Sequence, residues 1–331
     1  MSALGVVIIG GGRAGAAHAR AVADTPGTSL VAIADVDETR AQAFAEAHGC
    51  LAFTDYRQAL ERADVAVAMI ALPNFLHEAA TIAAASAGKH VFLEKPMADT
   101  LEECDRMMAA VDKAGVHLLV GHSQRYFAST IVARGLLQDG SLGTPVFATD
   151  TWYKPFGVAA RAPWFLDRAT GGGMWLMNGA HMVDRTCWVL DTAVASVKAW
   201  IGSPIHGLAA DDTAMALLTL GNGQHATIVH AGYRDRGVDK CQVEVTCTGG
   251  MLLFDSYSNT LAVDRDGRYE PVPVAPVDAF TQELRNLVGA VQGREELAVT
   301  PAWGRHIVEV LLACEESSRT GHEVAIASSA T

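Results

Sequence analysis

The chain has 331 residues, which is long for one ordinary hydrophobic core and suits two domains, or one domain with a large extension. Half of the residues are hydrophobic and 19% are charged, so the chain can bury a sizeable core. The formal net charge is −12 and the lysines and arginines form no cluster. This pattern argues against nucleic-acid phosphates and anionic membrane surfaces as partners.

The cellular context is inferred from the first residues, the apolar runs and the cysteines. The first residues carry no basic segment, and their apolar run is too short for a signal peptide. No apolar stretch approaches the ~20 residues that cross a bilayer. The six cysteines are scattered, with no C-x-x-C pair, so they suggest neither a zinc site nor a disulfide framework. We expect a reduced cytoplasmic protein without a metal.

The first third of the chain alternates short, continuously apolar runs with segments of helical period. The apolar runs predict strands buried on both faces, at residues 4–10, 29–35, 64–70, 90–95 and 116–121. The segments between them predict helices at residues 13–25, 37–49, 75–88 and 99–115. Asp37 and Asp99 are start signals for the second and fourth helices. The repeated strand–helix–strand order predicts an α/β fold with a parallel, doubly wound sheet.

The pattern changes after about residue 122. Helices are predicted at residues 127–140, 174–190 and 300–320, and a strand at 146–153. Gly221-Asn222-Gly223 and Gly249-Gly250 each separate two strand-like runs, which predicts hairpins and an antiparallel sheet. We therefore predict two domains, at residues 1–122 and 123–331, the second of the α+β class. The C-terminal helix is free to pack back on the first domain.

A glycine-rich turn follows the first predicted strand. Gly10, Gly12 and Gly15 match G-x-G-x-x-G at the start of a helix, and Asp35 ends the next strand. Such glycines let a backbone approach a pyrophosphate, and a carboxylate at this position accepts from ribose hydroxyls. The pattern predicts a dinucleotide site, with a purely structural turn as the alternative. Asp35 would repel a 2′-phosphate and so favours NAD, although Arg40 keeps NADP possible.

Glu94, Lys95 and Pro96 lie at the carboxyl end of the last but one predicted strand, where open α/β sheets bind their ligands. Pro96 disfavours helical backbone at Lys95, and the bond between them is one that can be cis. A lysine beside a nicotinamide can stabilise an alkoxide or polarise a carbonyl. The alternative is a surface lysine paired with Glu94.

Several segments resemble the Gfo/Idh/MocA oxidoreductase family over nearly the whole chain. They read VVIIGGGRAGAAHA, ALPNFLHEAA, GKHVFLEKPMADT, VGHSQRYF, GGGMWLMNGAHMVD and ACEESSRTGHEV. The resemblance implies an N-terminal Rossmann domain, a tightly held nicotinamide cofactor, and a C-terminal domain whose large, mostly antiparallel open sheet forms a homodimer or homotetramer interface. It also implies a small-molecule substrate, most often a sugar or cyclitol hydroxyl that is oxidised or the matching ketone that is reduced.

The resemblance also assigns roles by position. The cofactor residues it implies are Gly10, Gly12, Arg13, Ala14, Gly15, Asp35, Leu72, Pro73, Asn74, His77, Glu94, Lys95, Gln124 and Arg125. We expect the substrate to contact Lys95, Tyr153, Trp164, Asn178 and His181, of which Tyr153 and Asn178 are placed by their loop and helix positions and not by the resemblance. Trp164 can equally be a core anchor under its loop.

The segment from Gly171 to Asp184 departs from the family pattern. Many members have three glycines, three residues, an aspartate, three residues and a histidine. Here Met177 stands at the aspartate position and His181 at the histidine position. Histidine is the side chain suited to proton transfer near neutral pH. We therefore expect Lys95 and His181 to be catalytic, and Asp184 to pair with Arg185 or to orient His181.

Three functions remain open at this point. The first is an NAD-dependent dehydrogenase acting on a secondary hydroxyl of a sugar, cyclitol or related cyclic diol. The second is a glycosidase or lyase that oxidises its substrate transiently and re-reduces it. The third is a dinucleotide-binding regulator without catalysis, which would tolerate Met177 but would have little need for Lys95 and His181.

Overall fold

The computed structural model describes residues 3–327. These residues form two compact units. Unit 1 contains the described residues up to Gly121 together with Asp278–Arg305. Unit 2 contains His122–Val277 and the described residues from His306 onward.

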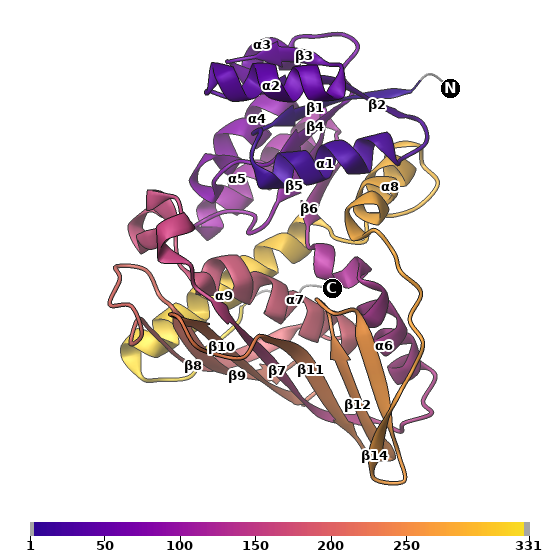
Figure 1. Ribbon diagram of the computed structural model, residues 1–331, viewed down its shortest axis with the longest axis vertical. Coiled ribbons are helices and arrows are strands. Elements are labelled where there is room, and N and C mark those ends of the chain that lie inside the picture. Colours follow the sequence, from indigo (N-terminus) through magenta and orange to yellow (C-terminus); the bar gives the residue numbers. More distant parts are fainter. Residues whose placement is uncertain (1–2, 328–331) are drawn as a thin grey trace. The chain divides into compact units, whose positions relative to one another are not determined.

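Unit 1 is built on a six-stranded parallel sheet with the strand order β3-β2-β1-β4-β5-β6 (Figure 1). The strands are β1 (Leu4–Ile9), β2 (Thr28–Ala34), β3 (Leu51–Phe53), β4 (Val67–Ile70), β5 (His90–Glu94) and β6 (Leu118–Gly121). All five predicted strands are present, which confirms the doubly wound sheet. The short β3 was not predicted. The order reverses direction beside β1, which is where such sheets bind nucleotides.

Helices of unit 1 lie on both faces of this sheet (Figure 1). They are α1 (Arg13–Ala23), α2 (Glu38–His48), α3 (Tyr56–Leu60), α4 (His77–Ser86), α5 (Leu101–Ala114) and α8 (Ala279–Val291). Asp37 caps α2 as predicted, because its side chain accepts a hydrogen bond from the amide of Arg40. α5 starts one residue later than predicted. Its cap is Thr100, which forms a reciprocal capping box with Glu103.

The segment 278–305 belongs to unit 1, whereas the boundary drawn from the sequence placed it in the second domain. The reason is the apolar face of α8. Leu284, Leu287 and Val288 are buried in the same hydrophobic cluster as Val6 and Phe92 of the parallel sheet. A composition change along the chain cannot reveal that a later helix returns to an earlier core.

Unit 2 contains a nine-stranded sheet with the order β14-β13-β12-β11-β7-β10-β9-β8-β15 (Figure 1). The strands are β7 (Pro145–Pro155), β8 (Val194–Gly202), β9 (Thr213–Leu220), β10 (His225–Tyr233), β11 (Lys240–Cys247), β12 (Gly250–Asp255), β13 (Thr260–Arg265), β14 (Arg268–Pro271) and β15 (Val324–Ala325). Both predicted hairpins form, as β9–β10 and β11–β12. β7 and β10 run parallel to each other, whereas the other neighbouring strands of the sheet are antiparallel. The sheet is therefore mostly antiparallel.

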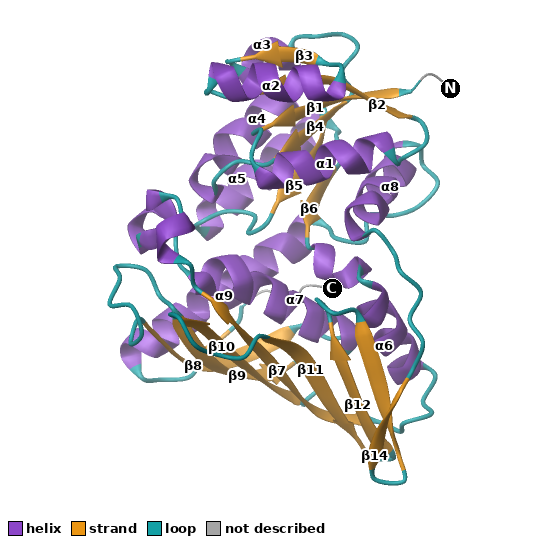
Figure 2. Cartoon of the chain, in the orientation of Figure 1, coloured by secondary structure: helices purple, strands orange, loops and turns teal. Residues whose placement is uncertain are grey.

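Figure 2 shows the helices of unit 2 on one face of this sheet. They are α6 (Ala128–Gln138), α7 (Ala180–Val189) and α9 (Pro301–Thr320), of which α9 begins in unit 1 and continues in unit 2 from His306. Side chains alternate along the strands: in β9, Ala216 and Leu218 are buried, while Met215 and Leu217 are exposed. The exposed face therefore carries large apolar side chains.

Two further observations concern membrane-spanning helices and the cysteines. No helix within residues 3–327 is long and apolar enough to cross a membrane. All six cysteines have free thiols, and all except the half-buried Cys50 are buried. The cysteines are therefore small core residues, as their scattered spacing suggested.

Candidate active site

The loop from β1 to α1 has the geometry that its glycines predict. Gly10 has φ +105°, and a Cβ there would lie 2.4 Å from the carbonyl oxygen of Ala71. A Cβ on Gly15 would lie 2.1 Å from the carbonyl oxygen of Gly10. Around Gly12, by contrast, a Cβ would meet no atom within 4 Å. The loop is thus tight on its inner side and open at Gly12, the N-cap of α1, which fits a phosphate-binding turn.

Arg13 and Ala14 form the first turn of α1 beside this open side. Their backbone amides belong to the group at a helix N-terminus that has no partner inside the helix. These amides and the positive end of the helix dipole suit a pyrophosphate. The residues of this loop therefore fit the phosphate part of a dinucleotide.

Asp35, at the end of β2, is fixed beside the glycine loop. Its Oδ2 accepts a hydrogen bond from the amide of Gly11 at 2.8 Å, and its Oδ1 accepts one from the amide of Asp37 at 2.9 Å. The guanidinium of Arg40 lies 3.6 Å from Asp35 and 2.7 Å from Asp37. That side-chain hydrogen bond from Arg40 lowers the pKa of Asp37. Arg40 therefore forms ion pairs with two carboxylates of its own chain.

The loop after β4 carries Leu72, Pro73, Asn74 and His77. Nε2 of the buried His77 lies 2.9 Å from the carbonyl oxygen of Leu72, and Nδ1 lies 3.0 Å from that of Pro96. Burial lowers the pKa of His77. Because backbone oxygens occupy both ring nitrogens, His77 joins the loops after β4 and β5 and has no ring nitrogen left for the predicted cofactor contact. Asn74 is also buried, and its side-chain amide donates to Asp99.

Glu94 and Lys95 lie at the carboxyl end of β5, as predicted, and the Lys95–Pro96 peptide is cis. The hydrogen-bond partner of Glu94 is His18 of α1, with Nε2 2.8 Å from Oε1. Burial by itself opposes the charge of Glu94, but the hydrogen bond and charge of His18 and the charge of Lys95 lower its pKa. His18 was missed because its only signal is its place one helical turn after Gly15.

Gln124 and Arg125 lie in a 3₁₀ turn at Ser123–Tyr126, and both side chains are buried within unit 2. Arg125 donates to Asp184 through Nε at 2.8 Å and Nη2 at 2.6 Å. Gln124 accepts from Arg185 at 2.7 Å. These contacts hold the turn to α7.

Arg185 was one of the alternatives expected as a partner of Asp184, and the structure contradicts that alternative. Arg185 instead donates to Asp150 of β7, through Nε at 2.7 Å and also through Nη2. Asp150 also accepts from the hydroxyl of Thr186 at 3.0 Å. The two neighbouring residues of α7 thus point to different sides of the helix, and each forms a buried ion pair with another element.

The triple glycine forms a turn around Asp211, a residue that the sequence did not single out. Gly173 has φ +106°, and a Cβ there would lie 2.1 Å from Oδ1 of Asp211. Oδ2 of Asp211 accepts from the amide of Trp175 at 2.7 Å. Burial raises the pKa of Asp211 to about 7. The buried carboxyl group of Asp211 therefore fixes the turn that precedes the helix carrying His181.

This helix is not continuous. Trp175–Gly179 form a π-helical turn, and α7 begins only at Ala180. A Cβ on Gly179 would lie 2.8 Å from the indole of Trp175, so the turn closes over that ring. The helix predicted at residues 174–190 therefore begins as a π turn, and α-helical spacing does not relate residues 177 and 178 to His181. Single π turns occur frequently at functional sites.

Met177 packs against a small apolar cluster of Phe156, Phe165 and Met174. Trp164 packs against the same cluster and stacks edge-on with Phe165 at 5.8 Å. The position of the family aspartate is therefore part of a hydrophobic core.

Asn178 and His181 flank a second group of side chains on the sheet. The amide nitrogen of the buried Asn178 lies 3.2 Å from Nε2 of His230, and ring centroids of Trp152 and the half-buried His181 are 6.2 Å apart. His230 and Trp152 are register partners on β10 and β7. Burial, together with the charges of Lys154 and Arg185, lowers the pKa of His230 to about 3. The sequence showed His230 only as one buried position in an alternating strand.

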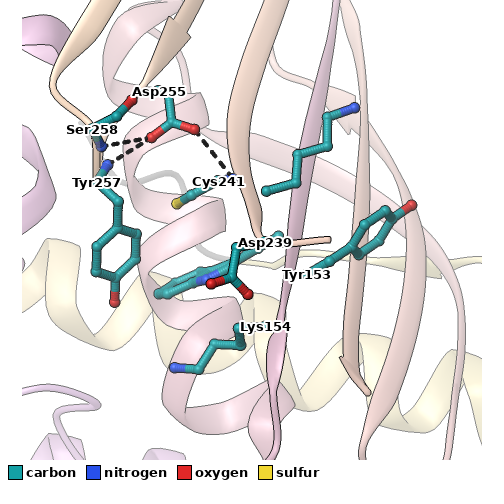
Figure 3. A pocket seen from close by; sticks show the side chains of 9 residues that line it. Tyr153, Lys154, Asp239, Cys241, Asp255, Tyr257 and Ser258 are labelled. Atoms are coloured by element: carbon teal, nitrogen blue, oxygen red, sulfur yellow. Dashed lines mark hydrogen bonds between the residues drawn. The ribbon is translucent and has the colours of Figure 1, made fainter. Parts of the chain in front are cut away.

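A pocket of about 410 Å³ lies in unit 2 next to Trp152 (Figure 3). Its lining includes Trp152, Lys154, Asp239, Cys241, Tyr257 and Ser258. The ammonium group of Lys154 lies 5.0 Å from the Trp152 ring centroid, and the Tyr257 ring lies 5.4 Å from it. Figure 3 shows Tyr153 pointing away from Lys154, as the alternation of a strand requires. Lys154, and not Tyr153, therefore lies on the same side of the strand as Trp152.

Comparisons with known proteins match a family model to a segment of each unit. Residues 4–122 match the model of the oxidoreductase family with an NAD-binding Rossmann fold. Residues 131–253 match the model of the GFO/IDH/MocA C-terminal domain. The two matched segments correspond to the parallel sheet of unit 1 and to most of the large sheet of unit 2.

Individual relatives are similar over almost their full length. The chain is 28% identical to the uncharacterized oxidoreductase YrbE of Bacillus subtilis, covering 96% of this chain and 95% of the relative. It is 29% identical to myo-inositol 2-dehydrogenase of Thermotoga maritima, covering 90% and 91%. The crystal structure of aldose-aldose oxidoreductase from Caulobacter crescentus complexed with glycerol superposes with a TM-score of 0.89 at 25% identity, covering 98% and 99%. The chain belongs to the Gfo/Idh/MocA family of NAD-binding oxidoreductases.

Proposed function

We propose that the protein is an NAD-dependent dehydrogenase that oxidises a secondary hydroxyl of a sugar, cyclitol or related cyclic diol, or reduces the matching ketone. The observation that carries the proposal is the arrangement of unit 1. The glycine loop follows β1 and Lys95 follows β5, and β1, β4 and β5 are neighbours in the parallel sheet. The phosphate-binding turn and the lysine therefore share the carboxyl edge of one sheet.

The roles of the two catalytic residues follow from their chemistry. His181 takes the proton of the substrate hydroxyl, and the ammonium group of Lys95 stabilises the alkoxide that forms. When bound, the dinucleotide supplies the hydride acceptor. Met177 lies in an apolar cluster and takes no part in proton transfer. Asn178, fixed by His230, binds a second hydroxyl of the substrate.

The cofactor in this proposal is NAD rather than NADP. Asp35 is held by two backbone amides, so its carboxylate stays in place and would repel a 2′-phosphate. Arg40, the residue that could attract the phosphate, lies against Asp35 and Asp37. We expect NAD to bind at least tenfold more tightly than NADP, and Asp35→Ser to reduce this preference. Equal affinities for the two dinucleotides in the unaltered protein would refute the assignment.

The substrate class rests on the relatives and on the polar pocket beside Trp152. The names of the Thermotoga and Caulobacter proteins specify an inositol and an aldose. The pocket combines aromatic rings with Lys154 and Asp239, a combination suited to a ring that carries several hydroxyl groups. We therefore propose a small polyhydroxylated ring as the substrate.

The proposed partner is a second copy of the chain. Large apolar side chains are about half exposed on the sheet of unit 2, among them Phe147, Trp200, Met215 and Leu217. Trp200 and Met215 are direct register partners on β8 and β9. An apolar patch of this kind on a sheet face marks an interaction surface. We propose a homodimer or homotetramer formed through this face.

A substrate screen at saturating NAD, read by NADH absorbance and by product analysis, tests the proposed function. We expect NADH to form with at least one sugar, cyclitol or cyclic diol. Release of an aglycone without net NADH would replace the proposal with transient oxidation. Tight NAD binding without turnover of any compound would replace it with a dinucleotide-binding regulator.

A further inference from the structure

We propose that His18 is a positioning residue for the dinucleotide, which acts by holding the carboxylate of Glu94 in place for the nicotinamide half of the ligand. This inference rests on the proposed function, because the dinucleotide is the ligand that Glu94 would serve. His18 does not itself touch the ligand in this account.

The geometry of the pair fixes the direction of its hydrogen bond. His18 is fully buried on α1, three residues after Gly15, and its Nε2 lies 2.8 Å from Oε1 of Glu94. Within the described residues, Nδ1 of His18 is buried and has no hydrogen-bond partner. Because an ionised carboxylate can only accept, Nε2 of His18 carries a proton and donates it to Glu94. Donation of this bond leaves Oε2 of Glu94 to accept from another donor.

The surroundings of the pair make this bond strong and specific. The imidazole of His18 lies edge-on to Phe92 at 4.8 Å and to Phe280 at 5.5 Å. Phe92 belongs to β5 and Phe280 to α8, so apolar rings from two elements enclose the imidazole side of the bond. A hydrogen bond to a charged group is stronger in such an environment than in water.

The topology of the sheet indicates which half of the dinucleotide Glu94 serves. Asp35 follows β2, on one side of the glycine loop, and Glu94 ends β5, on the other side. A dinucleotide lies across the carboxyl edge of such a sheet with its pyrophosphate at the helix N-terminus. With the adenosine ribose at Asp35, the nicotinamide ribose lies toward Glu94. One helix, α1, thus receives the pyrophosphate at its start and fixes Glu94 one turn later.

The test compares the binding of NADH and of ADP by calorimetry in the full chain. His18→Phe keeps the ring shape but removes the donor, and His18→Gln places an amide nitrogen near the position of Nε2. Phe280→Leu is the matched control, because it disturbs the packing around His18 and keeps the hydrogen bond. His18→Asn serves as a second loss variant, since its shorter amide does not reach Glu94.

We expect His18→Phe and His18→Asn to weaken NADH binding by about tenfold, as the loss of a hydrogen bond to a charged group implies. ADP, which has no nicotinamide half, should bind all variants within about twofold of the unaltered protein. His18→Gln should restore most of the NADH affinity. The double variant with Glu94→Gln should bind NADH no more weakly than Glu94→Gln alone, because the two residues act as one unit.

Three results would overturn the inference: unchanged NADH binding in His18→Phe and His18→Asn, an equal loss for ADP, or an equal loss in Phe280→Leu. Additive losses in the double variant would also contradict it. Failure of the proposed function gives a different result: the substrate screen then yields no NADH, whichever variants bind the dinucleotide, whereas this inference is read from the binding of NADH and ADP alone.

Discussion

The side-chain nitrogen of Asn178 lies 3.2 Å from Nε2 of His230, and this imidazole is buried against Trp152. Burial and the charges of Lys154 and Arg185 lower the pKa of His230 to about 3. His230 is therefore neutral at any pH at which an enzyme assay is run, and it accepts a hydrogen bond from Asn178 without taking a proton.

Replacement of His230 should consequently lower activity without changing its pH dependence. We expect His230→Phe to reduce kcat/KM by about three- to tenfold, the size of one neutral hydrogen bond, through loss of the fixed position of Asn178. The factor should be the same at pH 6 and at pH 9. Profiles of kcat/KM against pH for both proteins provide the measurement, and a displaced midpoint in the variant would contradict a neutral His230.

Met177→Asp, which restores the family residue, should not restore a catalytic carboxylate. The side chain would replace an apolar contact with the cluster of Phe156, Phe165 and Met174, and apolar surroundings oppose a charge. We expect a loss of about 1–3 kcal/mol of stability and no gain in kcat. Thermal unfolding and steady-state kinetics check this, with Met177→Leu as the size-matched control. A higher kcat at unchanged stability would show that position 177 faces the substrate.

Asp211 predicts how stability depends on pH. Its pKa is raised from 3.8 to about 7, so the folded protein keeps a proton that the unfolded chain releases. The resulting stabilisation is complete below pH 3.8 and is lost as the pH rises toward 7, at no more than about 1.4 kcal/mol per pH unit. Urea unfolding of the unaltered protein and of Asp211→Asn at pH 5 and pH 8 measures this. The free energy of unfolding should fall less with pH in the variant, and equal slopes would contradict the buried carboxyl group.

The exposed face of the large sheet predicts the effect of charge on assembly. Trp200 and Met215 are register partners and are about half exposed. We expect Trp200→Glu and Met215→Glu to shift the protein toward monomer in sedimentation analysis, because a charge would be buried at the interface. Val238→Glu is the control, since Val238 is 82% exposed in a loop outside the sheet. An unaltered protein that is monomeric, or variants that assemble normally, would remove this face as the interface.

The parts of the fold that follow from the sequence depend on local pattern. Buried parallel strands are continuous apolar runs, and hairpins carry their own turn residues, so both were predictable. The π turn at residues 175–179 was not, because it depends on Gly179 closing over Trp175 and on Asp211 binding the amide of residue 175. Likewise α8 was not among the predicted helices, and local pattern does not indicate the core to which it belongs.

The candidate site likewise contains residues that the sequence indicates and residues that it does not. The glycine loop, Asp35 and Lys95 are recognisable because their chemistry depends on neighbours in sequence. The pairing of His18 with Glu94 joins residues 76 positions apart, and that of Asn178 with His230 joins residues 52 apart. No spacing rule connects such positions, so the partners that fix the functional side chains became known only from the folded chain.

Deuterium transfer tests the central claim, a hydride step to a nicotinamide, most directly. The substrate that reacts best in the screen is labelled with deuterium at its carbinol carbon and incubated with the protein and NAD. The account predicts that the reduced dinucleotide carries the deuterium at C4 of the nicotinamide and that Lys95→Ala binds NAD but forms this product far more slowly. Product with the label lost to solvent, or an unchanged rate in Lys95→Ala, would contradict it.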